Sequence, residues 1–377
     1  MAENRLMKDG LGEEAVERIV QAFVSTMDQF PADQFRADAL NGLDGLELKE
    51  RVGHLIEVLH QYLPKEFEIT AELLTSMKPV WDRGDKDDPL RGFAAWPIID
   101  YIGVHGLNHP ELSLKALKHL TSLFSAEFAI RPFLISHMEV TLNHLRQWCG
   151  DADEHVRRLV SEGTRPRLPW GQRLPQFIAD PAPVIRLLEK LKDDESEYVR
   201  RSVANNLNDI SKDHPELVIQ TCRNWLDPSD RNRSKLIRHA TRTLVKSGHP
   251  EVFALLGYTQ SPKLSVQAPT LESHRIQLGE SANISALIRS TASEIQNFVV
   301  DYAVYHMKAN GQSSAKVFKL KTVTINPGET VELKRSHPFR KITTRKYYSG
   351  KHAIELLING VTYGRAEFEL SVPQTGR

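Results

Sequence analysis

The sequence of 377 residues predicts a mainly α-helical protein, with stacked helical pairs over residues 1–260 and a β-sandwich over residues 261–377. Three observations predict this division. Apolar residues recur at helical spacing through the first part. A His-Pro-Glu tripeptide recurs there at multiples of 35 residues. Near Ser261 and Pro262 the pattern changes to short alternating runs that are separated by turn residues.

The first helices are predicted from apolar stripes that end at prolines or loops. Such stripes run over residues 11–30, 48–63 and 67–77. The following segment, residues 81–92, is rich in aspartate but lacks the 12-residue pattern of calcium ligands with a terminal glutamate. We therefore interpret it as a solvated loop.

Two short marks repeat in the helical part. The His-Pro-Glu tripeptide begins at His109, His214 and His249, and Val-Arg-Arg begins at Val156 and Val199. A period of roughly 35 to 45 residues in helical sequence is typical of HEAT or armadillo repeats. The sequence therefore predicts a HEAT-like α-solenoid, whose inner helices line a concave surface suited to a long ligand.

The segment from Val156 to Gly171 is the most informative stretch. A helix ends at Gly163, and two following prolines hold a stiff loop. Glu162, Arg165, Arg167 and Trp170 therefore project within nine residues. Guanidinium groups fit phosphates, and an indole or a carboxylate favours a cation, so the loop suits a polyanion with a local positive charge. A surface turn with Trp170 as a packing anchor is the alternative.

Further candidates lie on the flanking helices. In the helix predicted over residues 197–212, Arg201 and Asp209 share a polar face, and Asp209 lies near the C-terminus, where the helix dipole disfavours a carboxylate. Residues 236–246 predict another helix, and Lys235, Arg238 and Arg242 form a basic stripe on one side of it. Such a stripe can contact phosphates, or it can serve only to keep the protein soluble. Glu127 has a simpler alternative, a first-turn acid in a helix capped by Ser125.

The C-terminal part predicts six or seven short strands in about 110 residues, which is typical of an immunoglobulin-like (Ig-like) sandwich without its disulfide. Within it, residues 334–352 interleave basic and aromatic residues. That composition suits either a nucleic-acid contact or an ordinary charged hairpin.

Composition limits the remaining possibilities. The net charge is +1, but residues 1–150 carry −8, residues 151–260 carry +2 and residues 261–377 carry +7, so the positive field lies in the second half. Cys149 and Cys222 form no disulfide framework, and no long apolar run or leader-like segment appears, so we expect a cytoplasmic protein without a membrane span. Fifteen scattered histidines without an HExxH motif predict no metal site.

Four motifs together resemble the AlkC branch of the AlkC/AlkD DNA glycosylases. They are AEFAIRPFL (126–134), VRRLVSEGTRPRLPW (156–170), VRRSVANNLND (199–209) and IRHATRTLVK (237–246). The resemblance covers about residues 10–260. The strand-rich tail resembles the Ig-like domain that one subgroup of AlkC proteins carries.

The resemblance implies an enzyme that hydrolyses the N-glycosidic bond of cationic alkylated bases in duplex DNA, without base flipping and without a cofactor. The implied substrates are 3-methyladenine, 3-methylcytosine and 1-methyladenine, and the product is an abasic site in base excision repair. The family's catalytic positions fall on Glu127, Glu162, Trp170 and Asp209. We expect a nucleoid-associated monomer. A non-enzymatic HEAT scaffold that binds DNA or protein is the alternative. The basic residues expected to contact phosphates are Arg158, Arg165, Arg167, Arg173, Arg201, Lys235, Arg238 and Arg242.

Overall fold

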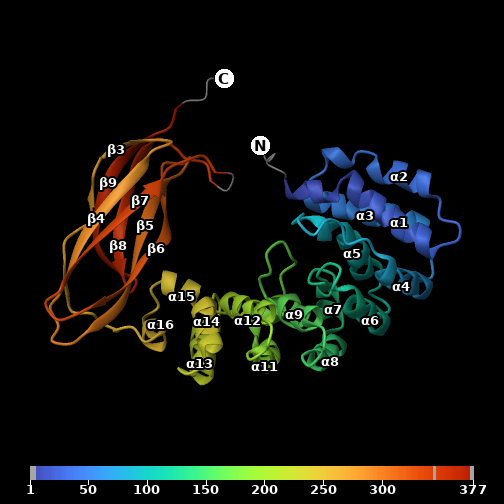
Figure 1. Ribbon diagram of the computed structural model, residues 1–377, viewed down its shortest axis with the longest axis horizontal. Coiled ribbons are helices and arrows are strands. Elements are labelled where there is room, and N and C mark those ends of the chain that lie inside the picture. The colour runs from blue at the N-terminus through green and yellow to red at the C-terminus, as the bar shows by residue number, and fades with distance from the viewer. Residues whose placement is uncertain (1–5, 343–344, 374–377) are drawn as a thin grey trace. The chain divides into compact units, whose positions relative to one another are not determined.

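The computed structural model describes residues 6–342 and 345–373, so residues 343 and 344 of the basic segment lie outside the described residues, as do residues 1–5 at the N-terminus. The chain divides into two compact units, Met1–Asp213 with Ser229–Ala240, and His214–Pro228 with Thr241–Arg377. Helices make up the first unit, and strands dominate the second (Figure 1). The predicted fold class, a helical solenoid followed by an Ig-like β-sandwich, is confirmed.

The helices of the first unit are short and follow one another closely. Their bounds are α1 Glu13–Thr26, α2 Ala32–Leu40, α3 Leu48–Tyr62, α4 Phe67–Ser76, α5 Trp96–His105, α6 Pro110–Leu120, α7 Arg131–Ser136, α8 Met138–Trp148, α9 Glu154–Gly163, α10 Pro175–Ala179, α11 Ala182–Leu191, α12 Glu197–Ile210 and α14 Arg231–Ala240. Four 3-10 turns accompany them: η1 Met7–Leu11, η2 Leu43–Gly45, η3 Lys78–Val80 and η4 Arg91–Ala95.

Alternate helices pack against each other, which is how stacked helical pairs bury their apolar faces. One row runs through α4, α6 and α8, and another runs through α9, α12 and α14. Each His-Pro-Glu mark places its proline at the first position of a helix, where the missing N–H is not needed. None of the helices within the described ranges combines the length and the apolar character that a membrane crossing requires.

Histidine–glutamate pairs connect helices within each unit: α4, α6 and α8 in the first, and α13 and α16 in the second. They join His109 to Glu68 at 3.0 Å, His144 to Glu111 at 2.7 Å, and His249 to Glu216 at 3.1 Å. Two of the histidines and two of the glutamates belong to the His-Pro-Glu marks. The mark thus has a physical role, because it both starts a helix and ties that helix to its neighbour.

The second unit begins with the helices α13 Pro215–Trp225, α15 Arg242–Lys246 and α16 Pro250–Leu255. Its strands are β1 Leu264–Val266, β2 Thr270–Leu271, β3 Arg275–Gln277, β4 Ser281–Ser290, β5 Gln296–Met307, β6 Ser313–Ile325, β7 Thr330–Pro338, β8 Gly350–Ile358 and β9 Val361–Ser371. They form one sheet in the order β1-β4-β2, with β7 also on β4, and a second in the order β3-β9-β8-β5-β6. Apolar side chains of both sheets share a core, for example Ile284 with Val304 and Phe368.

The three helices of the second unit pack on the sandwich. Phe253 of α16 lies in one buried cluster with Ile219, Leu244 and Val299 of β5. The turn between β8 and β9 approaches the helices so closely that a Cβ placed on Gly360 would lie 2.1 Å from the Cα of Gly248. The cores of the sandwich and of these helices are therefore continuous.

Two local expectations were wrong. Residues 236–246 do not form one helix, because α14 ends at Ala240 and α15 starts at Arg242. Residues 121–130 form turns, and α7 starts only at Arg131, so Ser125 caps no helix and Glu127 is not a first-turn acid. The side chain of Ser125 instead accepts a hydrogen bond from Arg158 at 2.8 Å.

Candidate active site

Helix α9 brings Glu162 to the buried side of the helical unit. Asp153 caps the helix by accepting from the His155 N–H at 2.9 Å, and an apolar face packs inward. Glu162 lies in the last turn, with 5 % of its surface exposed. The next residue is Gly163, and a larger residue would not fit there, because a Cβ would lie 2.7 Å from Cγ2 of Ile130. The close approach keeps the end of α9 against the segment that carries Glu127.

Helix α12 packs beside α9 and brings Asp209 to the same place. Arg165 joins the two acids, because its Nη1 lies 2.6 Å from Glu162 Oε1 and its Nε lies 2.8 Å from Asp209 Oδ2. The second oxygen of each acid is also held: Ser202 donates to Glu162 at 2.6 Å, and Lys212 to Asp209 at 2.9 Å. Two cations thus compensate for the unfavourable helix dipole at Asp209.

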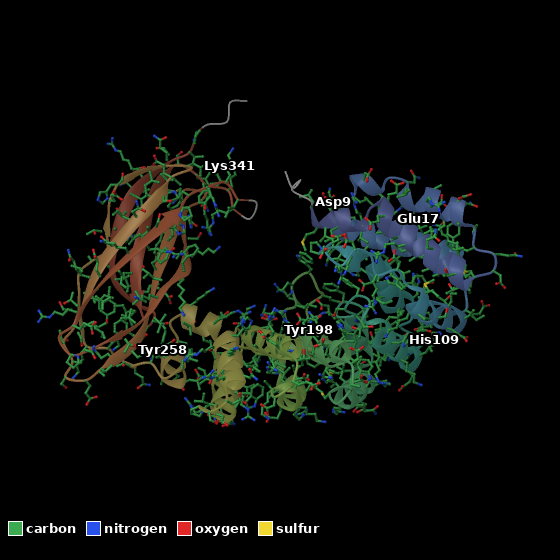
Figure 2. All side chains as sticks on the ribbon, viewed as in Figure 1. Asp9, Glu17, His109, Tyr198, Tyr258 and Lys341 are labelled. Carbon is green, nitrogen blue, oxygen red and sulfur yellow. The ribbon has the colours of Figure 1, made fainter. Side chains whose placement is uncertain are left out.

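Arg158 adds Glu127 to this network. Its Nη1 lies 2.8 Å from Glu127 Oε2, and its Nη2 lies 3.7 Å from Glu162 Oε1. The guanidinium also lies over the ring of Tyr198, labelled in Figure 2, at 4.7 Å from the centroid. The structure therefore brings three of the four predicted catalytic residues into one network of ion pairs.

The carboxylates hold these arginines in the charged state. Burial by itself opposes the charge on Arg165, but Glu162 and Asp209 more than offset it and raise the pKa of the guanidinium above its ordinary value. The pKa of Arg158 is also raised. Burial opposes its charge, but Glu127 and Glu162 more than offset this effect. The acids and their cations are therefore fixed as ion pairs before any ligand binds.

A buried arginine that the sequence analysis missed supports the loop. Arg131 is 0 % exposed and donates to the backbone carbonyls of Gly163 and Arg165 at 2.9 Å each, and also to that of Gln172. Burial, followed by the charge of Arg165, lowers the pKa of Arg131 to about 10, so the guanidinium still carries its charge at neutral pH. The sequence did contain a sign of this burial, because Arg131 stands among the apolar residues of the motif AEFAIRPFL.

Trp170 lies outside the ion-pair network, although the same loop carries it. Its backbone is left-handed, with φ of 64°, and 52 % of its surface is exposed. Such a conformation costs a non-glycine residue free energy and is often a mark of a functional site. Lys49 donates to its carbonyl oxygen, and the indole lines an open hollow with Leu48 and Met7.

The predicted phosphate contacts fall into two groups. Arg158, Arg165 and Arg167 are engaged in ion pairs within the protein, Arg167 with Asp213 at 2.7 Å. Arg173, Arg201, Lys235 and Arg238 are exposed on the helical unit, whereas Arg242 is half-buried and opens α15 in the second unit.

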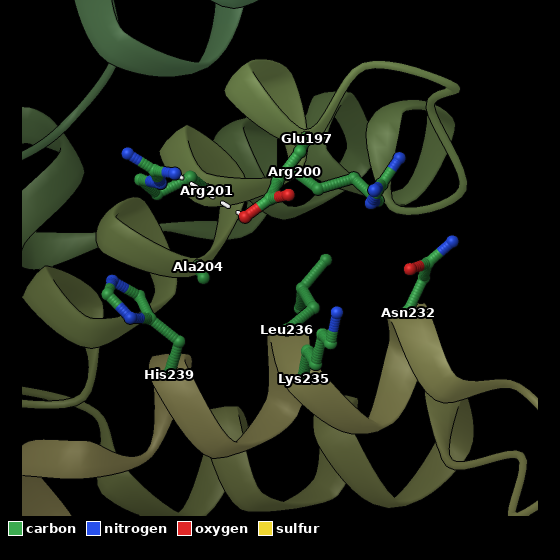
Figure 3. Close-up of a pocket in the computed structure, with 8 residues that line it drawn as sticks. All are labelled: Glu197, Arg200, Arg201, Ala204, Asn232, Lys235, Leu236 and His239. Carbon is green, nitrogen blue, oxygen red and sulfur yellow. Dashed lines mark hydrogen bonds and ion pairs between the residues drawn. The ribbon is translucent and has the colours of Figure 1, made fainter.

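Arg201 and Lys235 line one hollow of about 120 Å³ between α12 and α14. Arg200 and His239 share it, with Glu197 as the acidic member (Figure 3). Arg201 and Glu197 approach to 3.4 Å, but both are largely exposed, so water weakens their attraction. Three basic side chains, Arg200, Arg201 and Lys235, against one acid give the hollow a positive surface that suits a phosphate group.

Within residues 6–342 and 345–373, no cluster of three or more His, Cys, Asp or Glu side chains has an arrangement that could hold a metal ion. Both cysteines are buried and unpaired with each other, and burial raises the pKa of Cys149 to about 11 and that of Cys222 to about 12. Neither thiol is therefore activated as a nucleophile.

Comparison with known proteins identifies relatives of the whole chain. Residues 265–372 match the family described as "Uncharacterised protein YhaZ, C-terminal Ig-like domain". The uncharacterized protein YhaZ of Bacillus subtilis (strain 168) is 38 % identical over 97 % of this chain and 99 % of its own length. The alkylpurine DNA glycosylase AlkC of Pseudomonas fluorescens, solved with DNA containing an abasic site analog, superposes with a TM-score of 0.90 at 37 % identity, over 97 % of this chain and all of its own. The chain therefore belongs to the AlkC branch of the AlkC/AlkD family, in the subgroup that carries a C-terminal Ig-like domain.

Proposed function

We propose that this protein is a DNA glycosylase that removes cationic alkylated bases, namely 3-methyladenine, 3-methylcytosine and 1-methyladenine, from duplex DNA in base excision repair. The observation that carries the proposal is the network in which Glu127, Glu162 and Asp209 are held together by Arg158 and Arg165. Membership of the AlkC branch supports the same reaction.

The chemistry of the substrate explains why carboxylates are needed. An N3-alkylated purine is already a cationic leaving group, so its departure needs no general acid. Cleavage of the glycosidic bond moves positive charge onto the deoxyribose, as in other glycoside hydrolysis. Preorganised carboxylates stabilise that charge without reorganisation at the moment of reaction. We assign this electrostatic role to Glu162 and Asp209, whose positions are the most firmly fixed.

Glu127 is assigned to the attacking water. Its side chain is 14 % exposed, against 6 % for Glu162 and 3 % for Asp209, so it is the acid that solvent reaches most easily. A carboxylate that contacts water can orient it or accept its proton. Arg158, Arg165 and Ser202 then act as positioning residues that fix the three acids.

Trp170 is assigned to the sugar or the distorted backbone, where its exposed indole face attracts the developing cation. Each of the three acids is paired with a buried arginine, Glu127 with Arg158 and both Glu162 and Asp209 with Arg165. This arrangement supports a reaction without base flipping, in which the deoxyribose is brought to the protein surface.

We propose that the product is an abasic site and that the strand stays intact. Strand cleavage by a glycosylase requires a neutral amine as nucleophile. Lys212 contacts the acid network, but it is engaged as the ammonium partner of Asp209 at 2.9 Å. Reaction in the presence of borohydride tests this point, since a covalent protein–DNA adduct that Lys212→Gln abolishes would contradict it.

The decisive assay is the release of methylated bases from methylated duplex DNA in metal-free buffer. Asp209→Asn and Glu162→Gln should each lower the single-turnover rate by about 100-fold or more, because each removes one preorganised charge. DNA binding should stay nearly unchanged. Wild-type rates in either variant would contradict the assignment.

Asp194→Asn is the matched control. Asp194, in the loop before α12, forms a buried ion pair at 2.7 Å with Arg157 near the start of α9, and neither residue belongs to the acid network. Its loss should lower the free energy of unfolding and leave the excision rate of the folded protein within a factor of about two. If the wild-type protein binds DNA and releases no methylated base, the non-enzymatic scaffold becomes the better description.

A further inference from the structure

Asp100 is an acidic residue of α5 that lies within an otherwise apolar segment. Its Oδ2 accepts a hydrogen bond from the indole Nε1–H of Trp96 at 2.7 Å. Its Oδ1 is buried and has no hydrogen-bond partner within the described residues. A buried polar atom without a partner costs free energy, so such an atom calls for an explanation.

The surroundings of Asp100 lead directly to Glu127. The ring of Trp96 stacks on Phe124 and on Phe128, with centroid distances of 5.1 Å in both cases. These two phenylalanines bracket the turn that carries Glu127. The same indole therefore holds Asp100 by its N–H and the Glu127 turn by its ring faces.

Two charged groups from neighbouring elements act on Asp100. Lys49 at the start of α3 favours its ionised form, and Glu127 disfavours it. Burial is the largest influence and raises the pKa of Asp100 to about 7, in spite of the Trp96 hydrogen bond and Lys49, which lower it. Lys49 also donates to the carbonyl oxygen of Trp170. Asp100 thus interacts electrostatically both with Glu127, a member of the ion-pair network, and with Lys49, which contacts Trp170.

We propose that Asp100 is a fourth acidic group of the active site, a positioning residue that acts on the reaction through Glu127 and Lys49. This inference rests on the proposed glycosylase function and names a residue that the four family motifs do not contain. When Asp100 is ionised, it adds to the negative potential that Glu127, Glu162 and Asp209 supply to the sugar cation. When it is neutral, that contribution is absent. Excision should therefore become faster as the pH rises through the range in which Asp100 loses its proton.

The test is the single-turnover release of 3-methyladenine from duplex DNA methylated with dimethyl sulfate. The full-length protein is used between about pH 5.5 and pH 8.5, with enzyme-free DNA as the blank. The wild-type rate should rise about fivefold across neutral pH. Asp100→Asn keeps an oxygen that can accept from Trp96, and it should remove this rise and hold the rate at the low-pH level.

Lys49→Met provides a second, independent variant. Lys49 is exposed, so its substitution carries little risk to folding, and the loss of its charge should move the rise to higher pH because ionised Asp100 becomes less favoured. Thermal unfolding of each variant at two pH values separates a loss of structure from a change in the profile.

The possible outcomes are distinct. A wild-type pH profile in Asp100→Asn, or a rate lowered equally at every pH together with lost stability, overturns the role of Asp100 while base excision stands. A wild-type protein that releases no methylated base at any pH overturns the proposed function itself.

Discussion

At the scale of single residues, Arg131 explains how the loop of residues 164–174 keeps its shape. A loop that turns inside a protein must find partners for its carbonyl groups. Arg131 supplies donors to three of them from one planar side chain. Because those carbonyls belong to Gly163, Arg165 and Gln172, this one guanidinium fixes the backbone that places Arg165 in the acid network.

Arg131→Met should therefore be strongly destabilising. It leaves buried carbonyl groups without donors, and we expect the free energy of unfolding to fall by about 3 kcal/mol. Arg167→Met is the matched control on the same loop, since its pair with Asp213 is partly exposed to water and should contribute little to stability. Urea unfolding followed by circular dichroism measures both, and equal effects of the two substitutions would contradict the role of Arg131.

Single residues also define what the sequence could and could not predict about the site. Glu162 and Asp209 were predicted as neighbours in function from chemistry and family motifs, and the structure places both in one network. Their pairing with Arg165 was not predicted, because 44 residues separate Arg165 from Asp209 and the sequence shows no sign of that contact. The left-handed backbone of Trp170 was equally hidden, since glycine or asparagine usually marks such a position.

At the scale of elements, the two Val-Arg-Arg marks have the same structural role. The first arginine of each mark donates to carbonyl groups six and five residues before it: Arg157 to Asp151 and Ala152, and Arg200 to Asp194 and Glu195. The repeated tripeptide thus closes the loop ahead of its own helix. The second arginine differs, because Arg158 joins the acid network whereas Arg201 is exposed.

Because Arg201 is exposed and Arg158 is held in the acid network, we expect exposed residues such as Arg201 and Lys235 to contact the DNA phosphates. Arg201→Gln/Lys235→Gln should weaken binding to duplex DNA and reduce the slope of log K against log salt concentration by about two, since each lost phosphate contact contributes about 0.9. Fluorescence anisotropy over a salt series measures the slope. Lys115→Gln/Arg146→Gln, which removes two exposed charges from α6 and α8 in the other row, should leave it unchanged. An unchanged slope in the first variant would remove these phosphate contacts.

The sequence predicted those elements correctly whose apolar pattern is long enough to be recognised, and it missed the short ones. Of the six or seven short strands that alternation predicted, six are present as β4 to β9. Asn359 and Gly360 between β8 and β9 have positive φ, as a two-residue hairpin turn requires. Strands β1, β2 and β3 were missed because two or three residues carry no readable period. The break at Thr241 was missed because the apolar spacing continues across it.

At the scale of the whole molecule, the sandwich contains an unusual buried cluster of histidines. His306 is 4 % exposed, and neither ring nitrogen has a hydrogen-bond partner within the described residues, while His337 receives only the Tyr302 hydroxyl contact at 3.0 Å. Burial and then the charge of Arg345 lower the pKa of His306 to about 3 and that of His337 to about 4. Both rings are therefore neutral in the folded protein.

These lowered pKa values make the sandwich sensitive to acid. The unfolded chain binds protons near pH 6.5 and the folded sandwich does not, so stability is complete above about pH 6.5 and decreases below it. We expect a loss of about 2 kcal/mol per histidine between pH 7 and pH 5. Unfolding at both pH values, followed by near-ultraviolet circular dichroism, measures it, and His306→Phe should reduce the loss. A stability that is independent of pH in this range would contradict the burial of neutral rings.

The contact between Gly248 and Gly360 has a practical consequence for anyone dissecting this protein. A fragment that starts where the strands begin, at residue 262, would lack the helices that bury Val299. The isolated sandwich would then expose an apolar patch to water. Starting the fragment at His214 keeps α13, α15 and α16, and with them Ile219, Leu244 and Phe253, in place over that residue. The shorter fragment should aggregate in solution, whereas the longer fragment should remain monomeric.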